Sequence, residues 1–273
     1  MDVVIFMQGG TRYYSISNYL IEYFGRKTIK LSIDAGFTCP NRDGSLGIGG
    51  CSFCSSDGSG ELAAHICLDG EEGLIKQIDK SIERQVERLI NKWPDAAHIA
   101  YLQSHTNTYA PVSVLKKLYF AILENPKIDG IAIATRPDCL GIDENGESEI
   151  LDLLSEINKE HFLWVELGLQ TSNDATLKKL NTCYTSSEYK KAASALSSRG
   201  IRFVSHLILG LPGETYDDMV NSVNFVCKEC PKPFGLKLHL MNLVKNSPLA
   251  IENGAVAPEH PGNYAPYFSS IEE

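Results

Sequence analysis

The sequence predicts an α/β protein built as an open, partial (β/α)6 barrel of the TIM type, with a parallel six-stranded sheet. Apolar strand-like runs alternate with longer amphipathic segments along most of the 273 residues. Strands that are separated by helices pair in parallel through right-handed crossovers. Six such repeats are too few to close an eight-stranded barrel. We therefore expect an N-terminal extension over 1–28, the barrel over 29–243 and an irregular tail over 244–273.

Six short apolar runs predict the strands of this sheet. They span residues 29–33, 97–102, 130–134, 163–169, 202–209 and 235–240. Functional side chains of such barrels gather where the strands end, at the C-terminal rim. Unusual polar residues follow several of these runs, so we expect them to converge on one site.

Helix-like segments lie between the strands and carry apolar residues at helical spacing. They span residues 72–91, 112–124, 148–158, 187–199 and 216–230. A further short helix over 16–24 is expected in the N-terminal extension. The tail contains Pro248, Pro258, Pro261 and Pro266, which favour irregular structure.

The composition is typical of a globular domain in a reducing cytoplasm. Hydrophobic residues make up 43% of the chain, which is ample for one large core. No apolar run approaches the length of a membrane-spanning helix, and the first residues lack the features of a secretion signal. The eight cysteines suggest reduced thiols and metal ligation rather than a disulfide framework. We therefore expect a cytoplasmic protein without a membrane partner.

The net charge of −9 argues against broad, sequence-independent binding of nucleic acids. Such binding requires many phosphate contacts from lysine and arginine. A local basic face remains compatible with this charge. Short clusters of basic residues occur, and they are more typical of solvated helix and loop surfaces. They are Arg26, Lys27 and Lys30, then Lys178 with Lys179, and Lys190 with Lys191.

Three cysteines lie close together after the first predicted strand. Cys39, Cys51 and Cys54 have the spacing C-x11-C-x2-C, and the intervening loop is rich in glycine. The short C-x2-C pair is common in zinc and iron–sulfur sites. From the spacing alone, three interpretations stay open: an iron–sulfur cluster, zinc with Cys67 or His65 as the fourth ligand, and free thiols. Three protein ligands would leave one metal position open for chemistry.

Four stretches of the chain resemble the radical S-adenosylmethionine (SAM) superfamily. They are residues 30–44, 134–140, 165–171 and 205–215, and they occur in the order found in that family. The sequence is most similar to the bacterial Elongator-like radical SAM proteins. The long C-x11-C-x2-C loop suits this subgroup, whereas most of the superfamily has C-x3-C-x2-C.

The resemblance implies a cofactor and a reaction. Cys39, Cys51 and Cys54 would hold one [4Fe–4S] cluster, and SAM would bind at its open iron. Reductive cleavage of SAM would generate a 5′-deoxyadenosyl radical for hydrogen abstraction, with flavodoxin or ferredoxin as electron donor. Modification of a wobble uridine in tRNA is the implied use. A small-molecule or protein substrate is the alternative within enzymes, and a non-catalytic zinc-binding module is the alternative outside them.

The resemblance also implies residues that contact SAM. Ser104 and Thr106 occupy the position of the methionine-binding segment. Arg136 would pair with the SAM carboxylate, unless it forms a structural salt bridge. Glu166 and Gln170 would bind ribose hydroxyls or substrate, unless they belong to a buried polar network.

The fifth predicted strand and the turn after it carry two further candidate residues. Gly210, in the turn after the fifth predicted strand, would let the backbone approach adenine because it has no side chain. His206 could titrate near neutral pH in the cofactor site, although strand histidines are more often satisfied core residues. Cys227 and Cys230 form a second C-x2-C pair, and a lone pair of this kind is weak support for another metal site.

Overall fold

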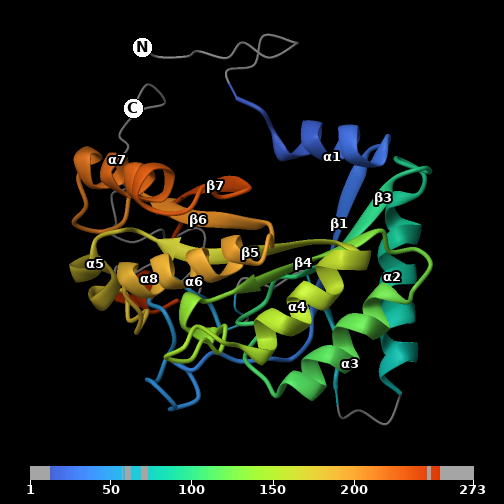
Figure 1. Cartoon of the computed structure of the whole chain (residues 1–273), viewed down its shortest axis with the longest axis horizontal. Helices are drawn as coiled ribbons and strands as arrows, with labels where there is room; N and C mark the ends of the chain where they lie inside the picture. Colours follow the sequence, from blue (N-terminus) through green and yellow to red (C-terminus); the bar gives the residue numbers. More distant parts are fainter. Residues whose placement is uncertain (1–12, 57, 59–62, 69–72, 245–246, 253–273) are drawn as a thin grey trace.

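The computed structural model describes residues 13–56, 58, 63–68, 73–244 and 247–252. Its strands form one open parallel sheet, drawn in Figure 1, with the order β2-β1-β3-β4-β5-β6-β7. The strands are β1 (Thr28–Asp34), β2 (Ala64–His65), β3 (Ala97–Leu102), β4 (Gly130–Thr135), β5 (Phe162–Gln170), β6 (Phe203–Leu209) and β7 (Gly235–Leu240). The predicted open, partial barrel is therefore confirmed.

The sheet has seven strands rather than the predicted six. The additional strand, β2, contains two residues and extends the sheet at its β1 edge, where Ala64 pairs with Ile33 and His65 with Asp34. A run of two residues has no measurable alternation, so the hydrophobic pattern could not reveal it.

The described helices lie around this sheet, and most of them cover its convex face (Figure 1). They are α1 (Ile16–Phe24), α2 (Leu74–Leu89), α3 (Val112–Leu123), α4 (Glu149–Glu160), α5 (Asp174–Lys179), α6 (Ser186–Ser198), α7 (Tyr216–Asn224) and α8 (Pro248–Glu252). A 3-10 turn at Pro137–Cys139 follows β4, and α7 continues as a π-helical turn at Phe225–Glu229. The helix predicted over 216–230 thus changes its hydrogen-bond pattern partway.

The predicted irregular tail contains one short helix within its described part. In α8, Leu249 and Ala250 are buried, and the backbone N–H of Leu249 donates to the carbonyl of Ser52 at 2.8 Å. Burial of two apolar side chains against the cysteine loop outweighs the proline-rich composition. Residues 253–273 of the predicted tail lie outside the described residues.

The buried apolar residues that the structure describes form three clusters, and side-chain alternation along the strands separates two of them. The larger cluster lies between the sheet and its covering helices and includes Leu163, Val165 and Leu167 of β5. The second lies on the concave face and includes Phe162 and Trp164, the alternate residues of the same strand. Leu20 of α1 packs into this second cluster, so α1 closes the N-terminal end of the concave face.

Helix α1 forms because its ends are well capped. The Ser15 side chain accepts a hydrogen bond from the Asn18 N–H at 3.1 Å, and Gly25 ends the helix in the left-handed conformation with φ 68°.

No helix in the described part of the chain is long and apolar enough to cross a membrane.

Candidate cofactor site

A cavity of about 300 Å³ lies on the concave side of the sheet, beyond the apolar cluster into which α1 packs. It brings together most of the predicted site residues from separate strand ends, as expected for the C-terminal rim of a barrel. The predicted residues that line it are Cys39, Cys51, Cys54, Thr106, Arg136, Glu166, Gln170 and His206. Ser104 and Gly210 are not among its lining residues.

The cysteine loop is held by the segment that follows α5. Asn181, with φ 55°, donates from its side chain to the carbonyl of Gly50 at 2.8 Å and to that of Ile48 at 3.1 Å. In return, Asn41 Nδ2 donates to the carbonyl of Asn181 at 2.7 Å. Glycine is favoured at position 50, because its φ is 77° and a Cβ there would lie 2.6 Å from the Arg42 side chain, which would have to shift.

Two of the three cysteine sulfurs accept hydrogen bonds from neutral side chains. Thr106 Oγ1 donates to Cys39 Sγ at 3.0 Å, and Asn41 Nδ2 donates to Cys51 Sγ at 3.3 Å. Burial raises the pKa of the Cys39 thiol, and it raises the pKa of Cys51 to about 12. These thiols therefore stay protonated without a metal, whereas directed donors suit metal-bound thiolates. The donor set fits an iron–sulfur cluster, whose sulfur ligands often receive such hydrogen bonds.

The positions of His65 and Cys67 count against zinc with either residue as fourth ligand. His65 lies in the edge strand β2, where its Nδ1 is 3.1 Å from Asp34 Oδ2. Cys67 is exposed, and its backbone N–H donates to Gln77 Oε1 at 2.9 Å. Neither residue lines the cavity. Within the described ranges, no three His, Cys, Asp or Glu side chains converge to hold one metal ion.

The segment after β3 contacts the cysteine loop rather than only bordering the cavity. The Asn107 side chain donates to the carbonyls of Leu102, Ser104 and Ala134, which fixes the turn. The fixed turn directs the hydroxyl of Thr106 to Cys39. Ser104, expected beside it in the methionine-binding segment, is buried, and its Oγ has no hydrogen-bond partner among the described residues.

Arg136 lines the cavity but already has a carboxylate partner. Its Nε and Nη2 donate to the two oxygens of Asp138 at 2.9 and 2.7 Å, and Nη2 also donates to the carbonyl of Thr182 at 2.7 Å. Burial alone would lower the pKa of Arg136, but the ion pair with Asp138 outweighs it and raises that pKa. The structural salt bridge considered for Arg136 is therefore present.

Glu166 lies at the base of the cavity and is surrounded by donors. Burial favours its neutral form, but the contact with His206 and the two lysine charges hold the pKa of this carboxyl well below its usual range. Five contacts saturate a carboxylate, so Glu166 forms the polar network considered for it rather than presenting a vacant oxygen to ribose. The contacts are Lys30 Nζ at 2.6 Å and Trp164 Nε1 at 3.1 Å on Oε1, then Tyr101 OH at 2.6 Å, His206 Nε2 at 2.8 Å and Lys237 Nζ at 2.9 Å on Oε2.

Gln170, His206 and His239 complete the polar lining. Gln170 has φ 72°, beside an irregularity in the β5–β6 pairing that turns its side chain into the cavity. Burial lowers the pKa of His206. Burial, together with Lys237, lowers the pKa of His239 to about 4, so both imidazoles are neutral at pH 7. Gly210 lies outside this lining, and its N–H donates to Met219 Sδ at 3.2 Å.

Several residues of the site were not predicted from the sequence. Lys30 carries a signal in retrospect, because a lysine inside an apolar strand needs a partner. Tyr101 and Lys237 carry none, since their partner Glu166 lies on a strand that is distant in sequence. Asn41 lies in the cysteine loop itself and donates to Cys51. Cys227 and Cys230 are not among the lining residues of the cavity.

Comparisons with known proteins identify relatives of the whole site region. Residues 38–226 match the family described as the radical SAM superfamily. YtqA of Bacillus subtilis is 41% identical over 238 residues, which are 87% of this chain and 69% of that protein. YhcC of Escherichia coli is 34% identical over 233 residues, which are 85% of this chain and 69% of that protein.

Two further matches are more limited. The crystal structure of methylornithine synthase (PylB) superposes with a TM-score of 0.54 and 13% identity, over 85% of this chain and 59% of that one, which shows a shared fold. A tRNA-2-methylthio-N(6)-dimethylallyladenosine synthase of Ehrlichia canis is 39% identical over 67 residues, which are 24% of this chain and 15% of that protein.

Proposed function

This chain belongs to the radical SAM superfamily, whose enzymes use a [4Fe–4S] cluster and SAM, and we propose that Cys39, Cys51 and Cys54 hold that cluster. The observation that carries the proposal is that all three residues line one cavity at the rim of the sheet, with side-chain donors directed at two of their sulfurs. When bound, the cluster and SAM supply a 5′-deoxyadenosyl radical by one-electron reductive cleavage.

The residues of the chain take supporting roles in this proposal. Thr106 and Asn41 donate hydrogen bonds to the cysteine sulfurs, which favours the thiolate forms. Gln170 lines the same cavity and binds ribose hydroxyls or substrate. Glu166 acts as a positioning residue, because its oxygens already hold Lys30 and Lys237.

Anaerobic reconstitution with iron and sulfide tests the ligand assignment. The triple variant Cys39→Ala, Cys51→Ala, Cys54→Ala should lose the absorption at about 400 nm that is typical of iron–sulfur proteins. The matched control is Cys227→Ala with Cys230→Ala, which removes the other C-x2-C pair and should load iron like the wild type. Equal loading of the triple variant, or loss of loading in the control, would contradict the assignment.

The substrate in this proposal is a nucleoside of tRNA, namely a wobble uridine. The short match to a tRNA-modifying synthase supports it, and so does the resemblance to Elongator-like proteins. Mass spectrometry of tRNA nucleosides from cells with and without the gene tests this step. Identical nucleoside profiles would leave a small-molecule or protein substrate.

Flavodoxin or ferredoxin is the proposed electron donor. An anaerobic assay for 5′-deoxyadenosine, with each donor and with tRNA present or absent, measures both the electron source and the effect of substrate. Formation of 5′-deoxyadenosine with dithionite alone, but with neither protein, would exclude these two donors.

A further inference from the structure

The loop between Cys39 and Cys51 is longer than ligation of a cluster needs. Most of the superfamily has three residues between the first two cysteines, whereas this chain has eleven. Part of the additional length folds into a small hairpin, in which Asp43 pairs with Ile48 in an antiparallel bridge. We call residues 43–48 the cysteine-loop hairpin. Because ligation uses only the two ends of the loop, the hairpin is available for another role.

The cysteine-loop hairpin exposes two large apolar side chains. Leu46 is 57% exposed and Ile48 is 79% exposed. The hairpin is nevertheless fixed in place, because the Leu46 N–H donates to the carbonyl of Pro40 at 2.7 Å and the Tyr109 hydroxyl donates to Ser45 Oγ at 2.8 Å. Single exposed apolar residues are common on protein surfaces, but an apolar patch that is held in water indicates an interaction site.

An apolar hollow of about 610 Å³ extends this patch. Its apolar lining comes from the cysteine loop, from the segment before α3 and from α4, namely Pro40, Leu46, Ala110, Pro111 and Ile150. Asp138 also lines the hollow, but both of its carboxylate oxygens already accept hydrogen bonds from Arg136. None of the described residues lines both this hollow and the cofactor cavity. A molecule in the hollow therefore lies outside the cavity, although Pro40 directly follows Cys39 in the chain.

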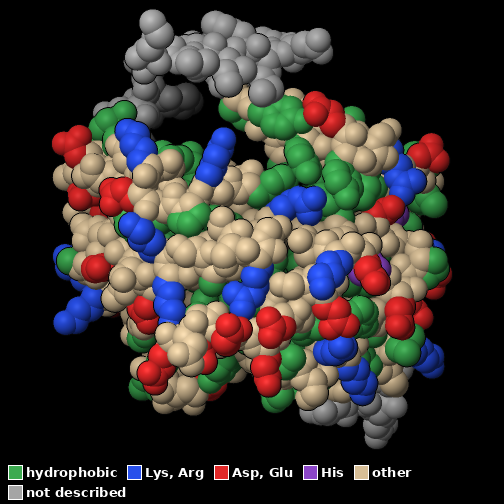
Figure 2. All heavy atoms as spheres, in the orientation of Figure 1, with side chains coloured by type: hydrophobic (Ala, Val, Ile, Leu, Met, Phe, Trp, Pro, Cys, Tyr) green, Lys and Arg blue, Asp and Glu red, His purple; other side chains and the backbone are tan. Residues whose placement is uncertain are grey.

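Two lysines flank the cysteine-loop hairpin. Lys178 and Lys179 end α5, both are exposed, and neither has an ion-pair partner among the residues that the structure describes. The Asn181 side chain, two residues further on, donates to the carbonyl of Ile48 at 3.1 Å, so the end of α5 lies against the hairpin. Figure 2 shows basic side chains at the left edge of the molecule, where Figure 1 draws α5.

The other charges of this edge already have partners. Asp43 Oδ1 accepts from a backbone N–H of the hairpin at 3.0 Å, and Asp174, at the start of α5, accepts from the Ser186 N–H at 2.7 Å. Arg42 Nη2 donates to the carbonyl of Ser55 at 2.5 Å. With the two lysines, the cations outnumber these two carboxylates. The edge is therefore locally positive in a chain whose net charge is −9.

The position and chemistry of this surface favour a protein over a substrate or an RNA. A substrate must enter the cofactor cavity to meet the radical, whereas an electron can cross the loop from outside. Recognition of single-stranded RNA relies on aromatic or guanidinium planes that stack on bases. The hairpin offers aliphatic side chains instead, which suit the apolar centre of a protein–protein contact. The flanking lysines suit a partner with an acidic surface, because complementary charge guides such encounters.

We propose that the cysteine-loop hairpin, the hollow beside it and the two lysines of α5 form the docking surface for a small, acidic one-electron carrier protein. The inference rests on the proposed cluster at Cys39, Cys51 and Cys54. In the step that it serves, the carrier is oxidised by one electron and the cluster is reduced by one, with no bond formed between the two proteins. Electron-transfer complexes of this kind use small interfaces, which a single hairpin and a short helix can provide.

Calorimetric binding of an oxidised flavodoxin to the reconstituted full chain tests the apolar part of the surface. The double variant Leu46→Ser, Ile48→Ser should raise the Kd by about tenfold, because the two side chains lose their burial against the carrier. The matched control is Ile75→Ser with Ile90→Ser, which changes two exposed apolar residues at the ends of α2 and should keep the wild-type Kd.

The same titration at several salt concentrations tests the lysines. Lys178→Gln with Lys179→Gln should raise the Kd by about fivefold at low salt, and the difference should disappear at high salt because salt screens exposed charges. The matched control is Arg84→Gln with Arg88→Gln, which removes the same charge from α2, on the other side of the sheet from α5 (Figure 1). This control should keep the salt dependence of the wild type.

Reduction of the cluster separates docking from damage to the site. With reduced flavodoxin, the hairpin variant and the lysine variant should lose cluster absorbance more slowly than the wild type. With dithionite, a small reductant that needs no docking surface, both variants should form 5′-deoxyadenosine at the wild-type rate. A hairpin variant that is slow with both reductants would mean that the substitutions disturb the cysteine loop, and it would contradict the docking role.

Further outcomes separate this inference from the proposed function. Wild-type affinity in both variants, or no binding of flavodoxin and ferredoxin by a chain that is active with dithionite, would overturn the docking surface and leave the cluster assignment intact. A wild type that forms no 5′-deoxyadenosine even with dithionite would overturn both. A hairpin variant that loses affinity for tRNA but keeps its affinity for the carrier would make this face an RNA interface. A wild-type dimer that the hairpin substitutions convert to a monomer, without any effect on the carrier, would assign the face to a second copy of the chain.

Discussion

The two ends of the concave face differ in chemistry, although the same strand, β5, lines both of them. At the N-terminal end, Phe162 and Trp164 of β5 pack with α1 in an apolar cluster. Two residues further along the same face of the same strand, Glu166 is buried among charged and polar donors, and Gln170 follows at the cavity. Along β5 the concave face thus changes from apolar packing to polar contacts between Trp164 and Glu166. The Trp164 Nε1–H donates to Glu166 Oε1 at 3.1 Å. The apolar cluster at the N-terminal end is therefore linked directly to the polar network through the hydrogen bond between Trp164 and Glu166.

The largest functional effect is expected from the polar end. Cys51→Ala should abolish formation of 5′-deoxyadenosine, because two cysteines do not hold the cluster. The free energy of unfolding of the metal-free protein should change by no more than about 1 kcal/mol, since the change is small and lies outside the packed clusters. Denaturant unfolding and an anaerobic activity assay measure the two effects. Retained activity in Cys51→Ala would contradict the assignment of the catalytic function to the polar end of the concave face.

The largest stability effect is expected from the closed end. Trp164→Ala should lower the free energy of unfolding by about 3–5 kcal/mol, because the fully buried indole leaves a cavity and Glu166 loses a donor. Trp93→Ala is the matched control. Its indole is partly exposed, with Lys27 and Lys92 over the ring, so its loss should cost about 1 kcal/mol. Equal losses in urea unfolding would contradict the comparison.

Glu166 lies between the two ends of the concave face. The loss of its charge is expected to have the next largest effect on the free energy of unfolding. Glu166→Gln should lower the free energy of unfolding by about 3 kcal/mol, because Lys30 and Lys237 lose their shared carboxylate in a buried setting. That value is the low end of the usual range, since both lysine side chains are 32% exposed. The control, Glu156→Gln, breaks an exposed pair with Lys116 and should cost less than about 1 kcal/mol.

The position of the site followed from the sequence, because it depends only on strand order and alternation. Strands that are predicted correctly bring their C-terminal ends to one rim, so Cys39, Thr106, Arg136 and Gln170 had to meet there. The short elements β2 and α5 were missed, since two and six residues are too few to show a period. The local hydrophobic pattern therefore predicts the longer strands and helices of the barrel, but it misses the shortest elements.

The partners of the buried charges could not be predicted in the same way. Glu166 meets Lys30 across 136 residues of sequence and Lys237 across 71. Whether a buried carboxylate faces a ligand or a lysine depends on such distant pairs. Arg136 is different, because its partner Asp138 is two residues away and the sequence offered the salt bridge directly.

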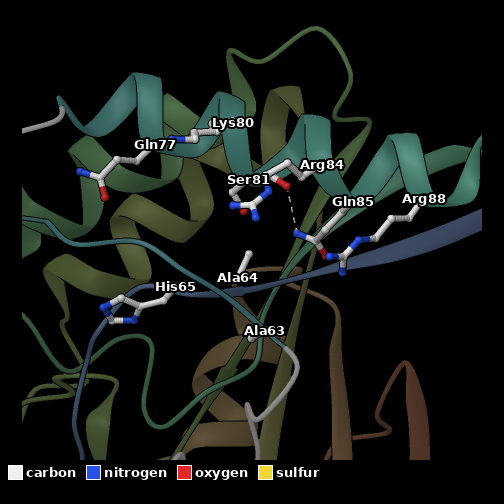
Figure 3. Close-up of a pocket in the computed structure, with 9 residues that line it drawn as sticks. All are labelled: Ala63, Ala64, His65, Gln77, Lys80, Ser81, Arg84, Gln85 and Arg88. Atoms are coloured by element: carbon white, nitrogen blue, oxygen red, sulfur yellow. Dashed lines mark hydrogen bonds between the residues drawn. The ribbon is translucent and has the colours of Figure 1, made fainter.

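The basic residues give a similar lesson about spacing. Some basic residues are adjacent in sequence, such as Lys190 with Lys191. Lys80, Arg84 and Arg88 of α2 are instead four residues apart, and they line one hollow beside β2 (Figure 3). On a helix, residues four apart share a side whereas neighbours diverge. The four-residue spacing of Lys80, Arg84 and Arg88 is visible in the sequence.

The smallest predicted effect is the pH dependence of stability that arises from His239 in the edge strand β7. The folded chain holds the pKa of His239 at about 4, first through burial and then through Lys237 and His206, whereas an unfolded histidine titrates near 6.5. Between these values the unfolded state binds more protons, so the folded state loses stability as the pH falls from about 6.5 to 4 and is unaffected above that window. His206, whose pKa burial also lowers, adds to the same trend.

Replacement of His239 isolates its share of this trend. His239→Gln should flatten the decline in stability by less than about 1 kcal/mol over the window, because β7 is an edge strand and His239 is exposed to solvent. Urea unfolding at several pH values measures the change, with His161→Gln at the end of α4 as the control. A steeper decline in His239→Gln than in the wild type would mean that the folded state favours the protonated imidazole. In that case Glu166, rather than burial and Lys237, would dominate the electrostatics of the cavity.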